Sequence, residues 1–238
     1  MSPTPEDDRD RDAQQFAAAG LVTDDPTGWF ERLYAAANKG EAVVPWDGGD
    51  PNRFLVEWVE RERPSAVGRR ALVVGCGFGD DSEYVAGLGF DTEAFDIAPS
   101  AIAEARRRHP GSAVRYRVAD LLRPPPEWRG AFGLVVEIYT LQALPDPPRR
   151  GAAVQLAGLV APGGTLLLIA FRRDPAAPEA PPPPWPLDRD DLDALTGAGL
   201  RPVRVEELVD ADRWRVEYRR DRPDEGARRP DADQDSTD

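Results

Sequence analysis

Residues 70–81, with the sequence RALVVGCGFGDD, decide the fold of this 238-residue chain. The apolar and partly β-branched residues 71–74 are typical of a buried parallel strand. Three glycines at alternate positions follow, and residues 80–88 then have the acidic first turn that favours a helix. A strand, a glycine-rich loop and a helix hold nucleotide-like ligands at the carboxyl end of a parallel sheet, because glycine lets the ligand approach the backbone.

The glycine loop excludes two common phosphate-binding patterns. The dinucleotide fingerprint G-x-G-x-x-G needs a third glycine at position 80 or 82, where the chain has Asp80 and Ser82. No Gly-Lys-Ser/Thr follows, so the phosphate-loop pattern is missing too. Asp80 and Asp81 would repel a pyrophosphate at the helix N-terminus. A ligand that lacks phosphate and carries a cationic amino group suits two carboxylates better, and S-adenosylmethionine is such a ligand.

Two further carboxylates follow predicted strands. Residues 91–96 predict a strand that ends in Asp96, 21 positions after Gly75, where a carboxylate can accept hydrogen bonds from both ribose hydroxyls. Residues 114–119 predict the next strand, and Asp120 follows it. We expect Asp120 to meet the adenine amino group, with a turn cap as the alternative. The residues expected to contact the cofactor are Gly75, Gly77, Gly79, Asp96 and Asp120.

Four segments make the chain resemble the class I S-adenosylmethionine-dependent methyltransferases. They are residues 74–81 (VGCGFGDD), 94–102 (AFDIAPSAI), 118–122 (VADLL) and 159–166 (LVAPGGTL). A narrower resemblance, to the thiopurine S-methyltransferase-like branch with its thiol- and halide-methylating enzymes, rests on residues 44–47 (VPWD), 139–145 (YTLQALP) and 183–187 (PPWPL). The resemblance covers roughly residues 29–218. It implies S-adenosylmethionine as the cofactor and a small molecule as the substrate.

The element pattern and the resemblance together predict an α/β fold with a Rossmann-like, doubly wound, mainly parallel seven-stranded sheet and an antiparallel edge. Strands are expected at residues 71–75, 91–96, 114–119, 132–137, 164–171, 201–208 and 213–220. Helices are expected at residues 14–21, 26–37, 51–63, 80–88, 99–108, 147–160 and 188–198. Residues 13–218 would form the methyltransferase domain. The segments 1–12 and 219–238 are rich in acids and poor in large apolar residues, so we expect disordered tails there.

The composition limits the partners and the location. A formal net charge of −13 argues against nucleic acid as a substrate. No apolar run approaches the roughly 18 residues of a membrane span, no signal peptide is visible, and the single cysteine excludes an internal disulfide. With one histidine and one cysteine, no metal site is expected. We expect a cytoplasmic protein, a monomer or weak dimer, that acts on a small molecule and binds no membrane.

The resemblance implies more contacts to the cofactor. It places Cys76, between two glycines of the cofactor loop, as a compact packing residue rather than a nucleophile. It also implies that Ile97 and Leu121 lie beside the cofactor. Asp81 is expected to reach the methionine amino group through water, and stabilisation of the helix N-terminus is the alternative role.

Aromatic side chains are candidates for the site because a sulfonium cation favours aromatic faces. Trp46 is expected to line the cofactor site, and Trp29 and Trp185 are further candidates, although tryptophans are often ordinary core residues. Residues 175–186 contain seven prolines and are expected to be extended. They form either a surface loop or a lid over the substrate.

Glu137 and Tyr139, at the end of the fourth predicted strand and just after it, are the candidate catalytic residues. Glu137 is expected to bind the methionine end of the cofactor, to orient the substrate or to act as a base. The alternative is a carboxylate that accepts hydrogen bonds from nearby backbone amides. Tyr139 is expected to hydrogen-bond the substrate. The only histidine, His109, ends a predicted helix and is not expected to be catalytic.

The shortage of histidine guides the choice of acceptor. Oxygen acceptors commonly need a base with a pKa near neutrality, whereas thiolates and halides need little or none. We therefore expect methyl transfer to a small-molecule thiol. Two alternatives stay open: O- or N-methylation of a secondary metabolite, and a scaffold that binds the cofactor without catalysis.

Overall fold

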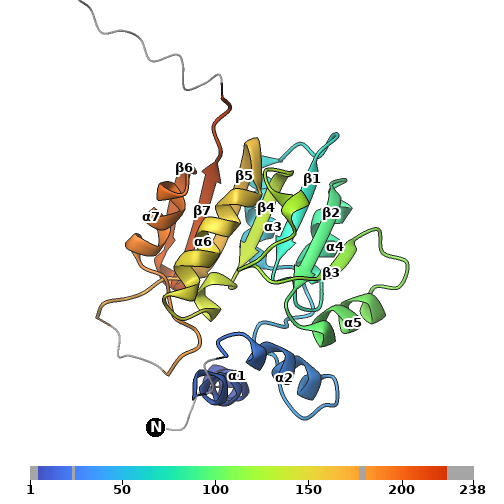
Figure 1. The fold of residues 1–238 in the computed structure, drawn as a ribbon, viewed down its shortest axis with the longest axis vertical. Coiled ribbons are helices and arrows are strands. Elements are labelled where there is room, and N and C mark those ends of the chain that lie inside the picture. The colour runs from blue at the N-terminus through green and yellow to red at the C-terminus, as the bar shows by residue number, and fades with distance from the viewer. Residues whose placement is uncertain (1–4, 23–24, 177–180, 224–238) are drawn as a thin grey trace, which may run out of the picture.

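The computed structural model describes residues 5–22, 25–176 and 181–223 (Figure 1). The strands of this part are β1 (Arg70–Val74), β2 (Asp91–Asp96), β3 (Arg115–Val118), β4 (Phe132–Ile138), β5 (Val160–Phe171), β6 (Arg201–Leu208) and β7 (Arg213–Arg219). They form one sheet in the order β3-β2-β1-β4-β5-β7-β6. The first five strands pair in parallel, and β7 runs antiparallel to β5 and β6. The predicted Rossmann-like sheet with its antiparallel edge is thereby confirmed.

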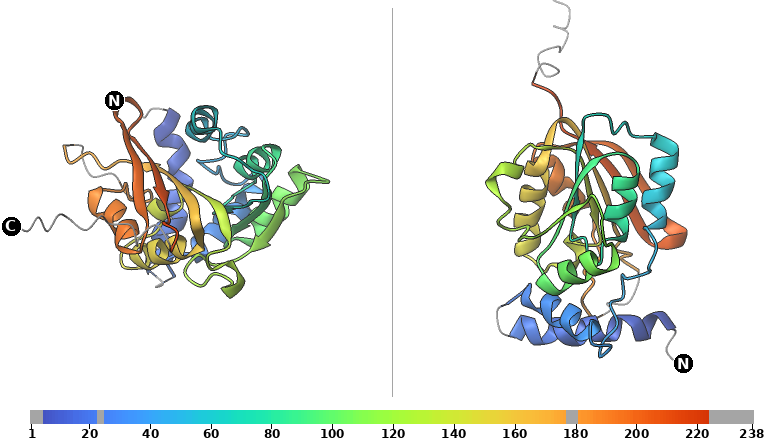
Figure 2. Two further views of the ribbon diagram at one scale, coloured as in Figure 1. Left: turned by 90° about the horizontal axis from the view of Figure 1, so that it is seen from above. Right: turned by 90° about the vertical axis from the view of Figure 1, so that its right-hand side faces the viewer.

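Helices cover both faces of the sheet and its lower edge (Figures 1 and 2). They are α1 (Pro5–Val22), α2 (Gly28–Ala37), α3 (Arg53–Glu62), α4 (Asp80–Gly87), α5 (Pro99–Arg108), α6 (Pro148–Leu159) and α7 (Arg189–Gly197), with short 3₁₀ turns η1 (Pro126–Trp128), η2 (Leu141–Ala143) and η3 (Val209–Ala211). The helices α6 and α7 lie on one face, and α3, α4 and α5 on the other. The helices α1 and α2 lie across the carboxyl ends of the parallel strands, at the bottom of Figure 1.

Apolar side chains fill the space between these layers. One cluster joins α6 and α7 to the sheet through residues such as Leu156 and Leu192. A second joins α3 and α5 to the other face through Trp58 and Ile102. A third, which includes Leu33, lies between α1, α2 and the start of α5. The third cluster fixes α2 over the strand ends, where it becomes one wall of the site.

The N-terminal boundary differs from the prediction. The helix α1 begins at Pro5, so most of the segment 1–12 that composition assigns to a disordered tail is helical. Ala13 and Ala17 are buried, and the Val43 N–H donates a hydrogen bond of 2.8 Å to the Asp12 carboxylate. Packing on the rest of the domain therefore holds a helix that lacks large apolar residues at its start. At the other end, β7 includes Arg219, and residues 224–238 of the predicted tail lie outside the described residues.

The strand β5 also begins earlier than predicted. It starts at Val160 rather than at residue 164, because Phe132 of β4 pairs with Val160 and Leu134 pairs with Thr165. The extra residues between these pairs contain the Pro162-Gly163-Gly164 turn and form a bulge. The other strand and helix ends lie within two residues of the predicted ones, except at the start of α1.

Candidate functional site

Three cavities meet at the carboxyl ends of the parallel strands. Trp46, between α2 and α3, and Tyr139, just after β4, line all three. The first cavity has a volume of about 640 Å³ and is lined by Asp96. The second, of about 720 Å³, is lined by Asp81, and the third, of about 580 Å³, by Arg213. Because the cavities share these two residues, a ligand with two parts could occupy the first two cavities while a second molecule occupies the third.

The loop after β1 requires glycine. Gly75 (φ 60°) and Gly77 (φ 53°) lie in the left-handed region that side chains disfavour. A Cβ atom on Gly75 would clash with the Thr140 hydroxyl, and a Cβ on Gly77 would lie 3.0 Å from the Tyr34 hydroxyl oxygen. Gly75 lines the first two cavities, and Gly77 and Gly79 line the second. The three predicted glycines thus bring the backbone to the cavity surface.

Asp96 lies at the end of β2 and is only 5% exposed. The Gly77 N–H donates to its Oδ2 at 3.0 Å, and the Ala98 N–H donates to its Oδ1 at 2.9 Å. Burial raises the pKa of Asp96 to about 6, and these backbone N–H groups oppose the shift. Each carboxylate oxygen keeps a second lone pair for a ligand hydroxyl. The Asp96 carboxylate can therefore accept hydrogen bonds from two neighbouring hydroxyl groups of a ligand.

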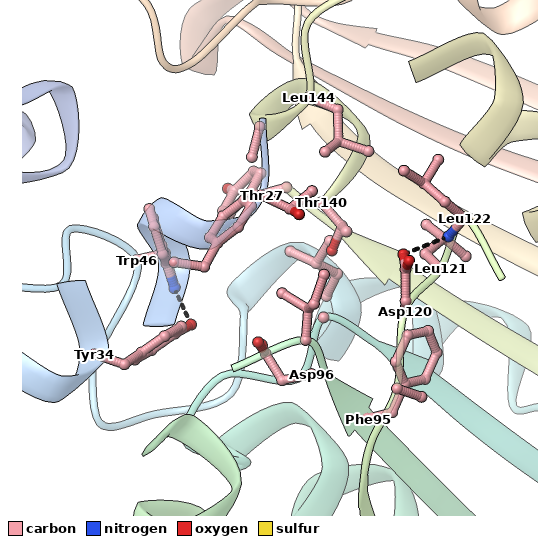
Figure 3. Close-up of a pocket in the computed structure, with 17 residues that line it drawn as sticks. Thr27, Tyr34, Trp46, Phe95, Asp96, Asp120, Leu121, Leu122, Thr140 and Leu144 are labelled. Atoms are coloured by element: carbon pink, nitrogen blue, oxygen red, sulfur yellow. Dashed lines mark hydrogen bonds between the residues drawn. The ribbon is translucent and has the colours of Figure 1, made fainter. Parts of the chain in front are cut away.

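The first cavity lies between α2 and the ends of β2 and β3 (Figure 3). Tyr34 and Trp46 form one side, where the Trp46 indole N–H donates to the Tyr34 hydroxyl at 2.7 Å. Asp120 and Leu121 lie on the opposite side, with Asp96 between the two walls. The remaining predicted contact at this cavity, Ile97, also lines it.

Asp120 caps a turn and also lines the first cavity. Its Oδ1 accepts a hydrogen bond of 2.8 Å from the Leu122 N–H, which caps the turn after β3. Its side chain also lines the first cavity. The capped turn therefore fixes the carboxylate at the cavity wall, where its remaining lone pairs can accept from an amino group.

The second cavity is rich in carboxylates. Besides the glycine loop, its lining includes Asp47, Asp50, Asp80 and Asp81. Asp81 accepts a hydrogen bond of 2.7 Å from the Asn52 N–H, and burial raises its pKa to about 6. These acids favour a cation over a phosphate.

Cys76 also lines the second cavity. It packs against the cluster that joins α3 and α5 to the sheet. Burial and, secondarily, the charge of Asp96 raise the pKa of the Cys76 thiol well above its usual range. A thiol kept protonated is a weak nucleophile, which agrees with a packing role.

Glu137 does not lie where the catalytic prediction placed it. Its side chain is fully buried and lines none of the three cavities. Its Oε1 accepts hydrogen bonds from the Thr140 N–H (2.7 Å) and the Leu141 N–H (2.9 Å). The alternative of a carboxylate bonded to backbone amides describes this geometry. These bonds hold the tight turn in which Tyr139 has a φ of 64°.

A buried carboxylate of this kind predicts a pH-dependent stability. Burial raises the pKa of Glu137 from 4.5 to about 7, and its Oε2 has no hydrogen-bond partner among the described residues. The native state therefore keeps a proton that the unfolded chain loses above pH 4.5, so the free energy of unfolding falls as the pH rises towards 7. In urea unfolding, Glu137→Gln is expected to be more stable than wild type by about 1 to 3 kcal/mol at pH 8.

That advantage is expected to shrink at pH 5, where both side chains are neutral. The control is Glu127→Gln, which removes a largely exposed glutamate that pairs with Arg117 and is expected to change stability little at either pH. A Glu137→Gln variant that is less stable than wild type at pH 8 would show that the charged carboxylate stabilises the turn.

The third cavity contains residues that sequence reasoning missed. Arg213, Phe171 and Gln142 line it together with Tyr139. The Arg213 Nε–H donates to the Tyr139 hydroxyl at 3.1 Å. Arg213 lies on the antiparallel edge, 74 positions from Tyr139, so no local motif connects the two.

Several sequence candidates lie outside this junction. Trp29 is buried, and its indole N–H donates to the Pro26 carbonyl. In the described part of the proline-rich segment, Pro183 and Pro184 line the third cavity, whereas Trp185 does not. His109 lies with its Nε2 3.7 Å from an Asp80 oxygen and lines none of the three cavities.

Comparison with known proteins agrees with this geometry. Residues 71–164 match the family described as a methyltransferase domain. A ubiquinone biosynthesis O-methyltransferase from Xanthomonas axonopodis pv. citri is 36% identical over 157 residues, which is 62% of this chain and 62% of that protein. One from Bordetella avium is 32% identical over 163 residues, 68% of this chain and 61% of that protein. The chain therefore spans less than two thirds of the length of these relatives.

Solved structures share the fold. One, described for the conversion of a disulfide bond into a thioacetal group during echinomycin biosynthesis, has a TM-score of 0.66 at 21% identity and covers 83% of this chain and 96% of its own. The N-methyltransferase NodS from Bradyrhizobium japonicum, in complex with S-adenosylhomocysteine, has a TM-score of 0.58 at 21% identity and covers 80% and 98%. These structures share the fold of the chain, and the match to the methyltransferase domain covers residues 71–164.

Proposed function

We propose that this protein is an enzyme that transfers a methyl group from S-adenosylmethionine to a small-molecule acceptor. The observation that carries the proposal is the meeting of three cavities at Trp46 and Tyr139. The first two suit the adenosine and methionine parts of the cofactor, and the third adjoins both. The matched methyltransferase domain and the relatives named as O-methyltransferases support the same activity.

The residues present fit the cofactor. In the first cavity, the two Asp96 oxygens would accept hydrogen bonds from the two ribose hydroxyls, Ile97 and Leu121 would flank the adenine, and Asp120 would accept from its amino group. In the second cavity, the close backbone at Gly77 leaves room for the methionine part. The carboxylates there attract its cationic amino group.

The chain contributes alignment and exclusion of water. The cofactor, when bound, supplies a methyl group activated by a sulfonium centre. Trp46 and Tyr139, which line all three cavities, would shield this centre from water and hold the acceptor in line with it. Their aromatic faces also favour the sulfonium charge. The acceptor atom approaches from the third cavity.

The element of the acceptor atom, sulfur or oxygen, is inferred from the bases near the third cavity. Among the described residues that line the third cavity there is no histidine, its carboxylate Asp10 has an interaction of its own, and Glu137 is buried away from it. An acceptor that ionises on its own fits this lining, so a thiol is the proposed acceptor, as in the thiopurine S-methyltransferase-like branch. Oxygen is the second candidate, because the relatives above are named as O-methyltransferases.

The test is turnover with matched acceptors. Purified protein is incubated with S-adenosylmethionine and either thiophenol or phenol, and formation of S-adenosylhomocysteine is measured from pH 5 to 9. We expect turnover of thiophenol with a rate that follows ionisation of the thiol, because no protein base is needed. Faster turnover of phenol would move the acceptor to oxygen. Binding of S-adenosylhomocysteine without turnover of any acceptor would favour the scaffold alternative.

A further inference from the structure

We propose that the third cavity binds the acceptor through a negatively charged group, and that Arg213 is the residue that holds this group. The inference rests on the proposed methyl transfer and names the acceptor class: a small, planar molecule with a carboxylate or an equivalent anion. Nothing in the domain match or in the names of the relatives assigns this role to Arg213.

The Arg213 guanidinium is fixed against the cavity wall. Arg213 is the first residue of β7 and pairs with Phe171 at the end of β5. Its guanidinium carbon lies 3.2 Å from the centre of the Phe171 ring and 5.4 Å from that of Tyr139. The Nε–H donates to the Tyr139 hydroxyl, and Nη1 donates to the carbonyls of Ala211 (2.9 Å) and Asp212 (3.2 Å). These partners leave Nη2 as the donor for a ligand.

The charge of Arg213 has no counterpart in the described part of the chain. Arg213 makes no ion pair with a described carboxylate, and the nearby Asp212 side chain pairs instead with Arg172 at 3.3 Å. The chain carries a net charge of −13, so acids for such a pair are plentiful. Asp10 of α1 also lines the cavity but has an interaction of its own. A half-buried guanidinium bonded only to neutral groups is a suitable partner for an anion.

The rest of the lining fits a planar ligand that accepts hydrogen bonds. Gln142 is buried, and its Oε1 accepts from the Phe171 N–H at 2.5 Å. Its amide nitrogen has no hydrogen-bond partner among the described residues, so it is a second donor at this wall. Phe171, Trp46, Pro183 and Pro184 make the rest of this lining largely apolar. An aromatic ring with a carboxylate fits both the hydrogen-bond donors and the apolar part of this lining.

The position of Arg213 also sets the direction of the acceptor. Arg213 lines only the third cavity, whereas its partner Tyr139 lines all three. A ligand whose anion binds Arg213 therefore extends along Tyr139 towards the junction with the cofactor cavities. Its reacting atom lies at the end of the ring opposite the anion. Para-substituted aromatic acids have this shape.

The test compares three probes of similar size: benzoate, benzamide and benzylamine. Each is titrated into protein saturated with S-adenosylhomocysteine, and the dissociation constant is measured by chemical-shift changes. We expect benzoate to bind at least about tenfold more tightly than the other two. Arg213→Gln is expected to remove this preference, and Arg213→Lys to keep part of it, while the affinity for S-adenosylhomocysteine stays at the wild-type value.

The matched control is Arg219→Gln, which removes the same charge from the far end of β7 and is expected to leave the preference for benzoate intact. Equal binding of benzoate and benzamide to the wild-type protein, or no binding of either, would overturn the inference. This comparison needs only the wild-type protein. Tighter binding of benzylamine that is lost in Asp10→Asn would show instead a site for cations. Failure of S-adenosylhomocysteine to bind would contradict the proposed function itself, which is a separate result.

Discussion

Asp96→Asn is expected to weaken the binding of S-adenosylhomocysteine about 100-fold, because it removes the charge from the group proposed to accept both ribose hydroxyls. In the wild type, the Gly77 and Ala98 N–H groups both donate to the Asp96 carboxylate. The NH₂ group of asparagine would face one of these two donors. Isothermal titration calorimetry measures the loss. The control is Asp91→Asn, the same substitution at the exposed start of the same strand, which is expected to leave the affinity unchanged.

The same carboxylate predicts the pH dependence of binding. Burial raises the pKa of Asp96 to about 6, so a rising share of the cofactor-free protein holds a protonated Asp96 as the pH falls below 6. The affinity of the wild type is expected to fall about tenfold between pH 7 and pH 5. Asp81, with a pKa of about 6, acts in the same direction.

The stability of the cofactor-free protein is expected to change in the opposite direction. A raised native pKa means that the native state binds protons more tightly than the unfolded chain, so Asp96 lowers stability as the pH rises through 4 to 6. An affinity that is flat from pH 5 to pH 8 would contradict the assigned role of Asp96.

Gly75→Ala is expected to destabilise the protein by about 2 to 4 kcal/mol and to abolish measurable binding of S-adenosylhomocysteine. The added Cβ meets the Thr140 hydroxyl, which donates to the Val74 carbonyl at 3.1 Å, and the left-handed φ of 60° adds backbone strain. The turn that carries Tyr139 would shift, because Thr140 follows it directly. Urea unfolding and calorimetry measure the two effects.

Gly111→Ala separates the backbone strain from the clash. Gly111 also has a left-handed φ of 82°, but a Cβ there would meet nothing within 4 Å. This variant is expected to lose about 1 to 2 kcal/mol of stability and to bind S-adenosylhomocysteine normally. Equal effects of the two substitutions on binding would show that contact with Thr140 is unimportant.

The sheet could be predicted from sequence because its signals are local. A glycine or an aspartate marks the end of β1, β2 and β3, and alternation with helices predicts the parallel order. The start of α1 could not be predicted in this way. Its residues carry little apolar surface, and the helix is held by contacts such as the bond from the Val43 N–H to Asp12.

The place of the candidate cofactor residues at the cavity wall could be predicted for the same reason. Gly75 follows β1, Asp96 is the last residue of β2, and Asp120 lies two residues after β3, so the topology of the sheet brings them to one end of the strands. Glu137 also ends a strand, but a strand-end position does not say which way a side chain turns, and this one turns into the core. Arg213 reaches the site from the antiparallel edge, so only the three-dimensional fold reveals it.

The most direct test of the account is a crystal structure of the protein with S-adenosylhomocysteine. We predict the ribose hydroxyls on the Asp96 carboxylate, the adenine between Ile97 and Leu121, and the sulfur atom at the junction formed by Trp46 and Tyr139. The third cavity would then be open to the sulfur atom. A ligand bound elsewhere, or a sulfur atom turned away from the third cavity, would contradict the central claim that methyl transfer occurs at this junction.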